Sequence, residues 1–283
     1  MTDEEKAQHE SEYKALLALF VALLKNLNND TREEALYALA ELRAELAINH
    51  AFRGLNLDIE EALMLLKNMD DENLTQHDKD LRDRVIAAVD NLIDFAVCEE
   101  YQLYQEVLEE CDDLDIDFNS DEYEELESLC EKYNDTYAAI ENSDIEYAAI
   151  MAARWIGMSG RDYVVYWTQN DVKVRPWHME LQGYAAPRDE FPSWMIPPIE
   201  WNCRCFLEVL DVKAQNNSIR NVKGSVNEIK KPTQLNDVFS ESLATCGRIF
   251  GPSHSYFQIK EEDKEMLQGF VLRIKERYYG QKV

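Results

Sequence analysis

Apolar residues recur at helical spacing through most of the first 150 residues of this 283-residue chain. The pattern is clearest from Leu16 to Leu27, where the leucines and Phe20 fall on one face of a helix. Further stripes of the same kind are Leu36, Leu39, Leu42 and Leu46, then Val85, Val89, Leu92, Ile93 and Ala96, and then Leu126, Leu129, Tyr133, Tyr137 and Ile140. This periodicity predicts amphipathic helices that pack their apolar faces together in a bundle.

Capping signals mark where two of these helices should begin. The run Thr31-Arg-Glu-Glu34 predicts a capping box at the start of one helix, and Ser143-Asp-Ile-Glu146 predicts a second one ahead of a helix over 147–156. Further helices are predicted over residues 58–67, 81–97 and 261–279, and the second of these could continue to Cys111.

Two short segments read as strands. Residues 163–167 (YVVYW) and 206–210 (FLEVL) are rich in β-branched and aromatic side chains. The long stretch between them contains prolines, tryptophans and an isolated Gly183, a composition that no amphipathic helix has. If the two strands pair, the connection between them must fold back on itself, which carries His178 toward Cys203 and Cys205.

The predicted fold class is therefore α+β and mostly helical, and charge separates its parts. An acidic helical bundle is expected over 1–156, a small α+β domain with a short antiparallel sheet and a Pro/Trp-rich loop over 157–211, and a C-terminal extension ending in a helix over 212–283. Residues 1–150 hold 11 Lys and Arg against 40 Asp and Glu, whereas residues 151–283 hold 18 against 16. The acidic part should repel nucleic acid and favour basic partner surfaces. A polar linker or surface segment is expected over 214–231.

Composition and the start of the chain indicate a protein made and folded in a reducing cytoplasm. Six cysteines are few for this length, and Cys203 and Cys205 are too close in sequence for an easy disulfide. The acidic start MTDEEKAQHE does not read as a signal peptide, and no apolar run approaches the roughly 20 residues that cross a membrane.

The set His178, Cys203 and Cys205 has the chemistry of a zinc site. Imidazole and thiolate are good zinc ligands, but a structural zinc takes four of them and this set offers three. Asp171 or a distant residue would have to complete it. The favoured interpretation is instead a metal-free polar knot, in which Arg175 and His178 bond the loop backbone, the cysteines pack as small apolar groups, and Arg204 and Asn202 tie the loop with Asp171 or Glu180 as charge partners.

The same stretch carries a family resemblance. The run Asp171-x-x-x-Arg175-x-x-His178 is followed by Leu181-x-Gly183, Pro197-Pro198 and Trp201-Asn202-Cys203-Arg204-Cys205. In order and spacing, these residues resemble the signature of the phage Mu F-like minor head proteins, and the resemblance covers residues 155–210. It marks 157–211 as a head morphogenesis module. Some members have Cys-x-x-Cys where this chain has Arg175-Pro-Trp-His178, and a guanidinium cannot replace a thiolate ligand.

The resemblance implies a structural protein of a tailed phage or prophage. Such a protein docks at the portal vertex during prohead assembly in the host cytoplasm and stays in the virion head, near DNA but not membrane. The implied partners are the portal protein and the major capsid or scaffolding protein, and the acidic helices would provide the docking surface. Packaging or ejection of DNA is a further role found among such proteins.

The sequence is also compatible with other functions. The signature domain also occurs fused to toxin or effector enzymes, so residues 211–283 could be a small enzyme domain, with His254 as its acid or base. The acidic half could instead mimic DNA. Asp113 to Glu124 resembles a calcium loop with Phe118 in place of the required glycine. Trp177, Trp194 and Trp201 could stack on bases but are expected to fill the core of the second domain. No P-loop or His-Glu-x-x-His motif is present, so no enzyme is predicted.

Overall fold

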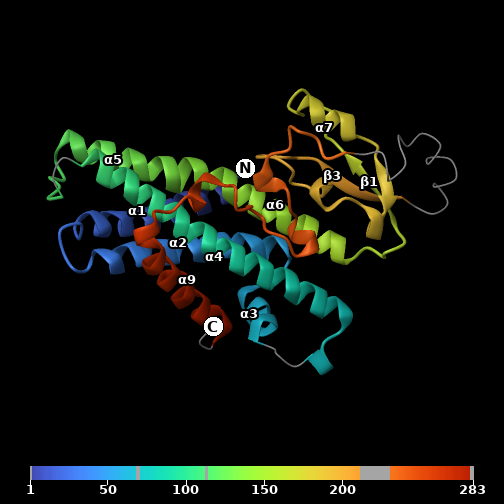
Figure 1. The fold of residues 1–283 in the computed structure, drawn as a ribbon, viewed down its shortest axis with the longest axis horizontal. Coiled ribbons are helices and arrows are strands. Elements are labelled where there is room, and N and C mark those ends of the chain that lie inside the picture. The colour runs from blue at the N-terminus through green and yellow to red at the C-terminus, as the bar shows by residue number, and fades with distance from the viewer. Residues whose placement is uncertain (1, 68–70, 112–113, 211–229, 281–283) are drawn as a thin grey trace. The chain divides into compact units, whose positions relative to one another are not determined.

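The computed structural model describes residues 2–67, 71–111, 114–210 and 230–280, and it shows a mostly helical α+β protein with a small antiparallel sheet (Figure 1). This confirms the predicted fold class. The α-helices are α1 (Asp3–Leu24), α2 (Arg32–Gly54), α3 (Ile59–Lys67), α4 (Gln76–Glu110), α5 (Asp121–Glu131), α6 (Ala138–Ile156), α7 (Pro176–Leu181) and α9 (Lys264–Tyr279). The strands are β1 (Tyr163–Trp167), β2 (Ala185–Pro187) and β3 (Phe206–Leu210). A π-helical segment, Lys132–Tyr137, joins α5 to α6.

The chain divides into two compact units, and each is discontinuous in sequence. The first, called here the helical unit, contains residues 1–50, 89–143 and 254–283. The second, called here the sheet unit, contains residues 51–88 and 144–253. Helices α2, α4 and α6 each contribute residues to both units. The predicted boundaries after residues 156 and 211 follow the sequence, and the compact units are a different division of the chain.

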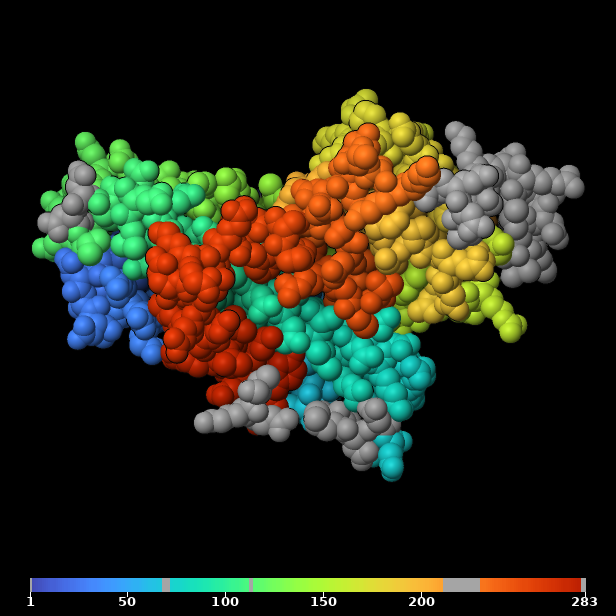
Figure 2. All heavy atoms as spheres, viewed as in Figure 1, coloured from blue at the N-terminus to red at the C-terminus, as the bar shows by residue number. Residues whose placement is uncertain are grey.

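Most of the stripe from Leu16 to Leu27 and part of the later stripes lie in the core of the helical unit, whereas Tyr137 is exposed and Val85 is buried in the sheet unit. Leu16, Phe20, Leu23 and Leu24 on α1 are buried, and α1 begins well before them because Thr2 and Glu5 form a reciprocal capping box. The C-terminal segment of this unit, red in Figure 2, covers one of its faces. Hydrogen bonds fix it there, among them those from Tyr101 to Asp263 and from Arg273 to Glu34. Leu267, Phe270, Ile274 and Tyr278 are the buried residues of α9.

The predicted helix start at Ser143 is wrong. Helix α6 already begins at Ala138 and passes through Ser143 without interruption. The residues on either side explain why a capping signal fails here. Asn142 accepts a hydrogen bond from buried Arg43, and Asp144 accepts one from the backbone N–H of Asn202. Tertiary partners therefore satisfy polar side chains that would otherwise compete with the helix backbone.

Thr31 does not act as the predicted cap either. Its hydroxyl hydrogen-bonds to the side chains of Asn26 and Asn29, in the turn before α2. Reciprocal capping instead occurs between Asp58 and Glu61 ahead of α3. The acidic run that resembles a calcium loop enters α5 as a turn in which Ser120 caps the helix, and Asp113 lies outside the described residues.

The sheet confirms the pairing of the two predicted strands and adds a third. The strand order is β2-β1-β3, and both pairs are antiparallel. In the pair of β1 and β3, Trp167 lies opposite Phe206, so the intervening chain leaves and re-enters the sheet at one end. Strand β2 was not predicted because its sequence, Ala-Ala-Pro, has little intrinsic preference for strands.

Two further findings bear on the predicted regions. Most of the expected linker, residues 214–229, lies outside the described residues. Within the part of the chain that is described, no helix combines the length and apolar character needed to span a membrane.

Candidate functional site

The signature residues lie in the loop between β1 and β3 in the sheet unit. Helix α7 carries His178, and Pro176 at its first turn fits a position whose N–H would have no helical partner. Gly183 follows the helix with a φ of 81°, a left-handed conformation that glycine adopts without steric cost. Its N–H donates to the carbonyl of Tyr166 in β1, at 2.9 Å. The turn at Gly183 therefore returns the chain to the sheet.

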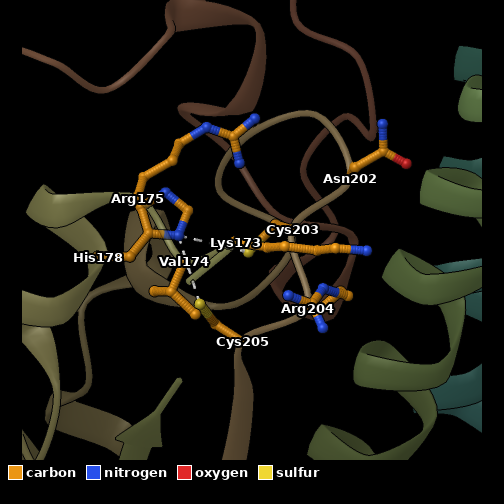
Figure 3. A pocket seen from close by; sticks show the side chains of 8 residues that line it. All are labelled: Lys173, Val174, Arg175, His178, Asn202, Cys203, Arg204 and Cys205. Atoms are coloured by element: carbon orange, nitrogen blue, oxygen red, sulfur yellow. Dashed lines mark hydrogen bonds between the residues drawn. The ribbon is translucent and has the colours of Figure 1, made fainter. Parts of the chain in front are cut away.

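The predicted ligands His178, Cys203 and Cys205 form one buried cluster (Figure 3). The imidazole Nδ1 of His178 lies 3.3 Å from the sulfur of Cys205 and 3.9 Å from that of Cys203. The three possible ligand atoms all lie within 4.8 Å of one another. The other ring nitrogen, Nε2, is buried without a hydrogen-bond partner among the described residues. These three residues could hold a metal ion.

The two thiols differ in acidity. The pKa of Cys205 is lowered, first because Cys203 donates a hydrogen bond to it, with help from the nearby charges of Arg175 and Arg204. The pKa of Cys203 is raised well above its ordinary value, first by this same hydrogen bond and then by burial. Without a metal, Cys205 is therefore the more acidic thiol of the pair. The deprotonated form of a cysteine is the one that binds a metal, so the lowered pKa of Cys205 favours ligation.

Polar contacts from the other signature residues hold the loop around this cluster. The Arg175 guanidinium donates to the carbonyl of Trp201 at 2.8 Å, and Arg204 pairs with Asp171 at 2.8 Å. Arg175 therefore bonds the loop backbone and Arg204 uses Asp171, both as expected for a polar knot. The prediction that His178 would also bond the loop backbone is wrong, because its Nδ1 faces the two sulfur atoms and its Nε2 has no hydrogen-bond partner among the described residues. Lys173, Val174 and Asn202 complete the lining of a small pocket over the cluster.

Helix α6 provides anchors that the sequence pattern does not single out. Asp144 accepts the backbone N–H of Asn202 at 2.9 Å, and the hydroxyl of Tyr147 donates to the carbonyl of Cys205 at 2.6 Å. Both residues appear in the sequence only as members of a helical stretch, so nothing local indicates this role. The loop is thus fixed to α6 on both sides of Cys203. We call the loop with these contacts the His/Cys knot.

Some signature residues lie away from the cluster. Gly183 serves the turn after α7, and Pro197 and Pro198 are buried and joined by a cis peptide bond. Asn202 has a φ of 55°, which its short amide side chain tolerates better than most. The signature therefore combines cluster residues with residues that shape the backbone.

The tryptophans do not fill the core as predicted. Trp177, Trp194 and Trp201 are each only half-buried. Trp201 stacks on Phe250 with ring centroids 5.3 Å apart, and Trp177 lies against His178 at 4.0 Å. The buried positions of this region are instead taken by smaller side chains and tyrosines, namely Val164, Val165, Tyr166, Tyr184, Met195, Ile196 and Ile199.

His254, the other histidine considered for chemistry, is a helix cap. It is buried in the helical unit, and its Nδ1 accepts the backbone N–H of Tyr256. Its ring packs on Tyr256 and Phe95, at centroid distances of 4.3 and 5.1 Å. Burial lowers the pKa of His254 to about 4, so at neutral pH the ring is uncharged.

Comparison with known protein families, with curated proteins and with solved structures found no match.

Proposed function

We propose that this chain is a structural minor head protein of a tailed phage or prophage, similar to the Mu F-like family. The observation that carries the proposal is the convergence of the signature residues on the His/Cys knot. Asp171, Arg175, His178, Cys203 and Arg204 contact the loop or one another through the bonds described above. A signature whose members stabilise a loop fits a structural module, because such residues specify shape.

The charge distribution supports docking of the acidic half on a basic surface. Residues 1–150 carry a large excess of carboxylates, and α5 displays Asp121, Glu124 and Glu125 to solvent. Complementary charge of this kind mainly governs the rate and specificity of association, and salt weakens it. The portal protein is the proposed partner, and binding would take place during prohead assembly in the host cytoplasm. The chain would then remain in the virion head.

Co-expression with the portal protein of the same genome, followed by size-exclusion chromatography, tests this function. We expect the two proteins to elute together at low salt and to separate as salt rises. The variant Asp121→Asn, Glu124→Gln, Glu125→Gln should lose most of the complex at moderate salt. A matched variant on the C-terminal segment, Glu262→Gln with Glu265→Gln, should retain it.

Separation of the two proteins at every salt concentration would contradict the proposal. The effector and DNA-mimic alternatives would then be tested next, by assaying residues 211–283 for enzymatic activity and the acidic half for binding to a polymerase or nuclease. For the effector alternative, the buried and capping role of His254 is unfavourable, since a general acid or base must reach its substrate.

We also propose that the His/Cys knot binds one zinc ion through His178, Cys203 and Cys205. For tetrahedral zinc with Zn–S and Zn–N bonds of roughly 2.3 and 2.0 Å, neighbouring donor atoms lie roughly 3.5 Å apart. The observed nitrogen–sulfur distances of 3.3 and 3.9 Å lie on either side of that value. Three protein ligands leave one position of the metal for water or another small ligand. The donor types and spacing therefore fit zinc, with a coordination sphere that is not closed by protein.

Metal analysis of the purified chain tests the zinc proposal. After incubation with zinc and removal of excess metal, we expect about one zinc ion per wild-type chain and a small fraction of that in Cys203→Ser, Cys205→Ser. The exposed Cys246 offers a matched control, because Cys246→Ser should keep the metal. Cobalt bound in place of zinc should give the absorption band of thiolate coordination. A wild-type chain that retains neither metal would refute the site.

A further inference from the structure

A cluster of charged residues is buried in the core of the helical unit, and none of these residues belongs to the His/Cys knot. Arg43 on α2, Glu99 on α4 and Glu141 on α6 have exposed fractions of 0%, 0% and 3%. Each nitrogen of the Arg43 guanidinium lies near a polar side chain. Nε lies 2.8 Å from Glu99, Nη2 donates to Glu141 at 2.8 Å, and Nη1 donates to Asn142 at 3.0 Å.

Glu100, next to Glu99 on α4, is fully buried but has no comparable partner. Its oxygen Oε2 accepts only a long hydrogen bond from the Asn134 amide, at 3.4 Å. Its other oxygen, Oε1, has no hydrogen-bond partner among the described residues, and neither does Oδ1 of Asn134. An ionised carboxylate in this position would be poorly compensated.

Asn134 belongs to the π-helical segment Lys132–Tyr137, and its neighbours also make polar contacts. The hydroxyl of Tyr133 donates to Glu106 at 2.7 Å, and Asp135 lies 2.8 Å from His9. Three consecutive residues thus reach polar groups on α4 and α1. Irregular π-helical turns of this kind commonly mark sites where side-chain demands override the regular helix.

Charge balance requires this cluster to retain protons. Three carboxyl groups surround one guanidinium, so full ionisation would leave two uncompensated negative charges in the core. Burial, first among the causes, raises the pKa of Glu99 well above its ordinary value and that of Glu100 to about 7. Glu141 accepts a hydrogen bond from the Arg43 guanidinium at 2.8 Å.

Other titratable groups face the cluster from each packed element. Cys130 on α5, Tyr133 on the π-helical segment and Tyr256 on the C-terminal segment interact with its carboxylates. The pKa of each is raised, first by burial, so all three stay neutral near pH 7. The histidine pairs of the unit, His9 with Asp135 and His50 with Glu12, lie on its α1 side. Among these groups, Glu100 is the one whose pKa, about 7, lies near neutral pH.

We propose that Glu100 holds a proton in the folded helical unit, and that loss of this proton loosens the contact between α4 and the π-helical segment. The stability of the helical unit then depends on whether this buried cluster keeps its proton. The proposal does not depend on the phage function.

The sign of the effect on stability follows from the direction of the shift. The folded pKa of Glu100, about 7, lies above the ordinary value of 4.5. Its contribution to stability is therefore complete below pH 4.5, decreases as pH rises, and is lost above pH 7. Between those two pH values the folded state holds one more proton than the unfolded state. The folding equilibrium constant should fall roughly tenfold for each pH step of one.

Chemical unfolding at pH 5 and pH 7 tests the proposal in the full chain. All five tryptophans lie in the sheet unit, so far-UV circular dichroism is needed to follow the helical unit. Relative to Glu100→Gln, the wild type should lose about fortyfold in folding equilibrium constant between these pH values. Glu109→Gln, on an exposed position of the same helix, should behave like the wild type. Identical pH dependence of wild type and Glu100→Gln would overturn the proposal.

Infrared spectroscopy gives a second readout, which holds even if Glu100→Gln folds poorly. The wild type should show the carbonyl stretch of a protonated carboxyl group at pH 6, where exposed carboxylates are ionised. Part of this band should disappear as pH rises through 7, together with faster hydrogen exchange of amides in 132–137 after correction for the intrinsic rate. A wild-type spectrum whose carboxyl band does not change between pH 6 and pH 8 would refute the proposed proton on Glu100.

Discussion

At the scale of residues, the His/Cys knot depends on a few side chains with specific partners. Cys203 and Cys205 have exposed fractions of only 4% and 2%, and both contact the imidazole of His178. The sequence predicts that His178 lies near the two cysteines, because pairing of the strands on either side of the loop brings the ends of the loop together. It could not indicate the anchors Asp144 and Tyr147, because a helical stripe does not reveal which of its members will contact a distant loop.

Replacing both cysteines by serine should destabilise the sheet unit selectively. Two buried hydroxyls in place of thiols should lower its free energy of unfolding by ~1–3 kcal/mol. Tryptophan fluorescence reports this unit alone, since all five tryptophans lie in it. The fluorescence transition of Cys203→Ser, Cys205→Ser should therefore move to lower denaturant, while the transition of the helical unit stays in place. Cys246→Ser should leave both unchanged. Equal stability of the double variant and the wild type would mean that the thiols are not needed for the knot.

At the scale of elements, two helical glycines make opposite demands on packing. A Cβ at Gly54, at the end of α2, would lie 2.3 Å from the carbonyl oxygen of Glu146 and 2.6 Å from the Cβ of Ala149. A Cβ at Gly269 in α9 would meet nothing within 4 Å. The first glycine thus permits close approach of α2 and α6 in the sheet unit, whereas the second has no such role.

The same substitution should therefore have opposite effects at these positions. Gly54→Ala should lower the free energy of unfolding of the sheet unit by ~1–3 kcal/mol, because backbone and a short side chain cannot move aside. Gly269→Ala should raise that of the helical unit by ~0.5–1 kcal/mol, because alanine restricts the unfolded chain and favours helix. Denaturant titrations followed by tryptophan fluorescence for the first and by circular dichroism for the second measure both. A destabilising effect at Gly269 would show that α9 packs more closely than described.

The periodicity of apolar residues predicts most helices and strands. It fails where contacts with residues distant in the sequence determine the local structure. The stripe around Leu16 and the strand over 163–167 follow from local pattern alone. The helix through Ser143 does not, because Arg43 and Asn202 satisfy its flanking polar residues. Strand β2 exists because the turn at Gly183 brings Ala185 opposite Val165, a register that no local signal contains.

At the scale of the whole molecule, charge and topology are distributed differently. The acidic excess is confined to residues 1–150, which suggests a boundary near residue 150. The compact units instead combine early, middle and late segments of the chain. Composition varies along the sequence, whereas compactness depends on which helices share a core. A charge step can therefore indicate where surface properties change without locating a structural unit.

The discontinuous helical unit also constrains how the protein is made. Its core includes residues 254–280, which leave the ribosome after every other segment of this unit. During synthesis, part of the apolar surface of α1 and of the first part of α2 stays uncovered until those residues have been made. Nascent chains in that state tend to aggregate. The high density of carboxylates in the same segments would keep such an incomplete chain soluble. The acidity of the first half would thus protect a unit that becomes complete only after its last segment has been translated.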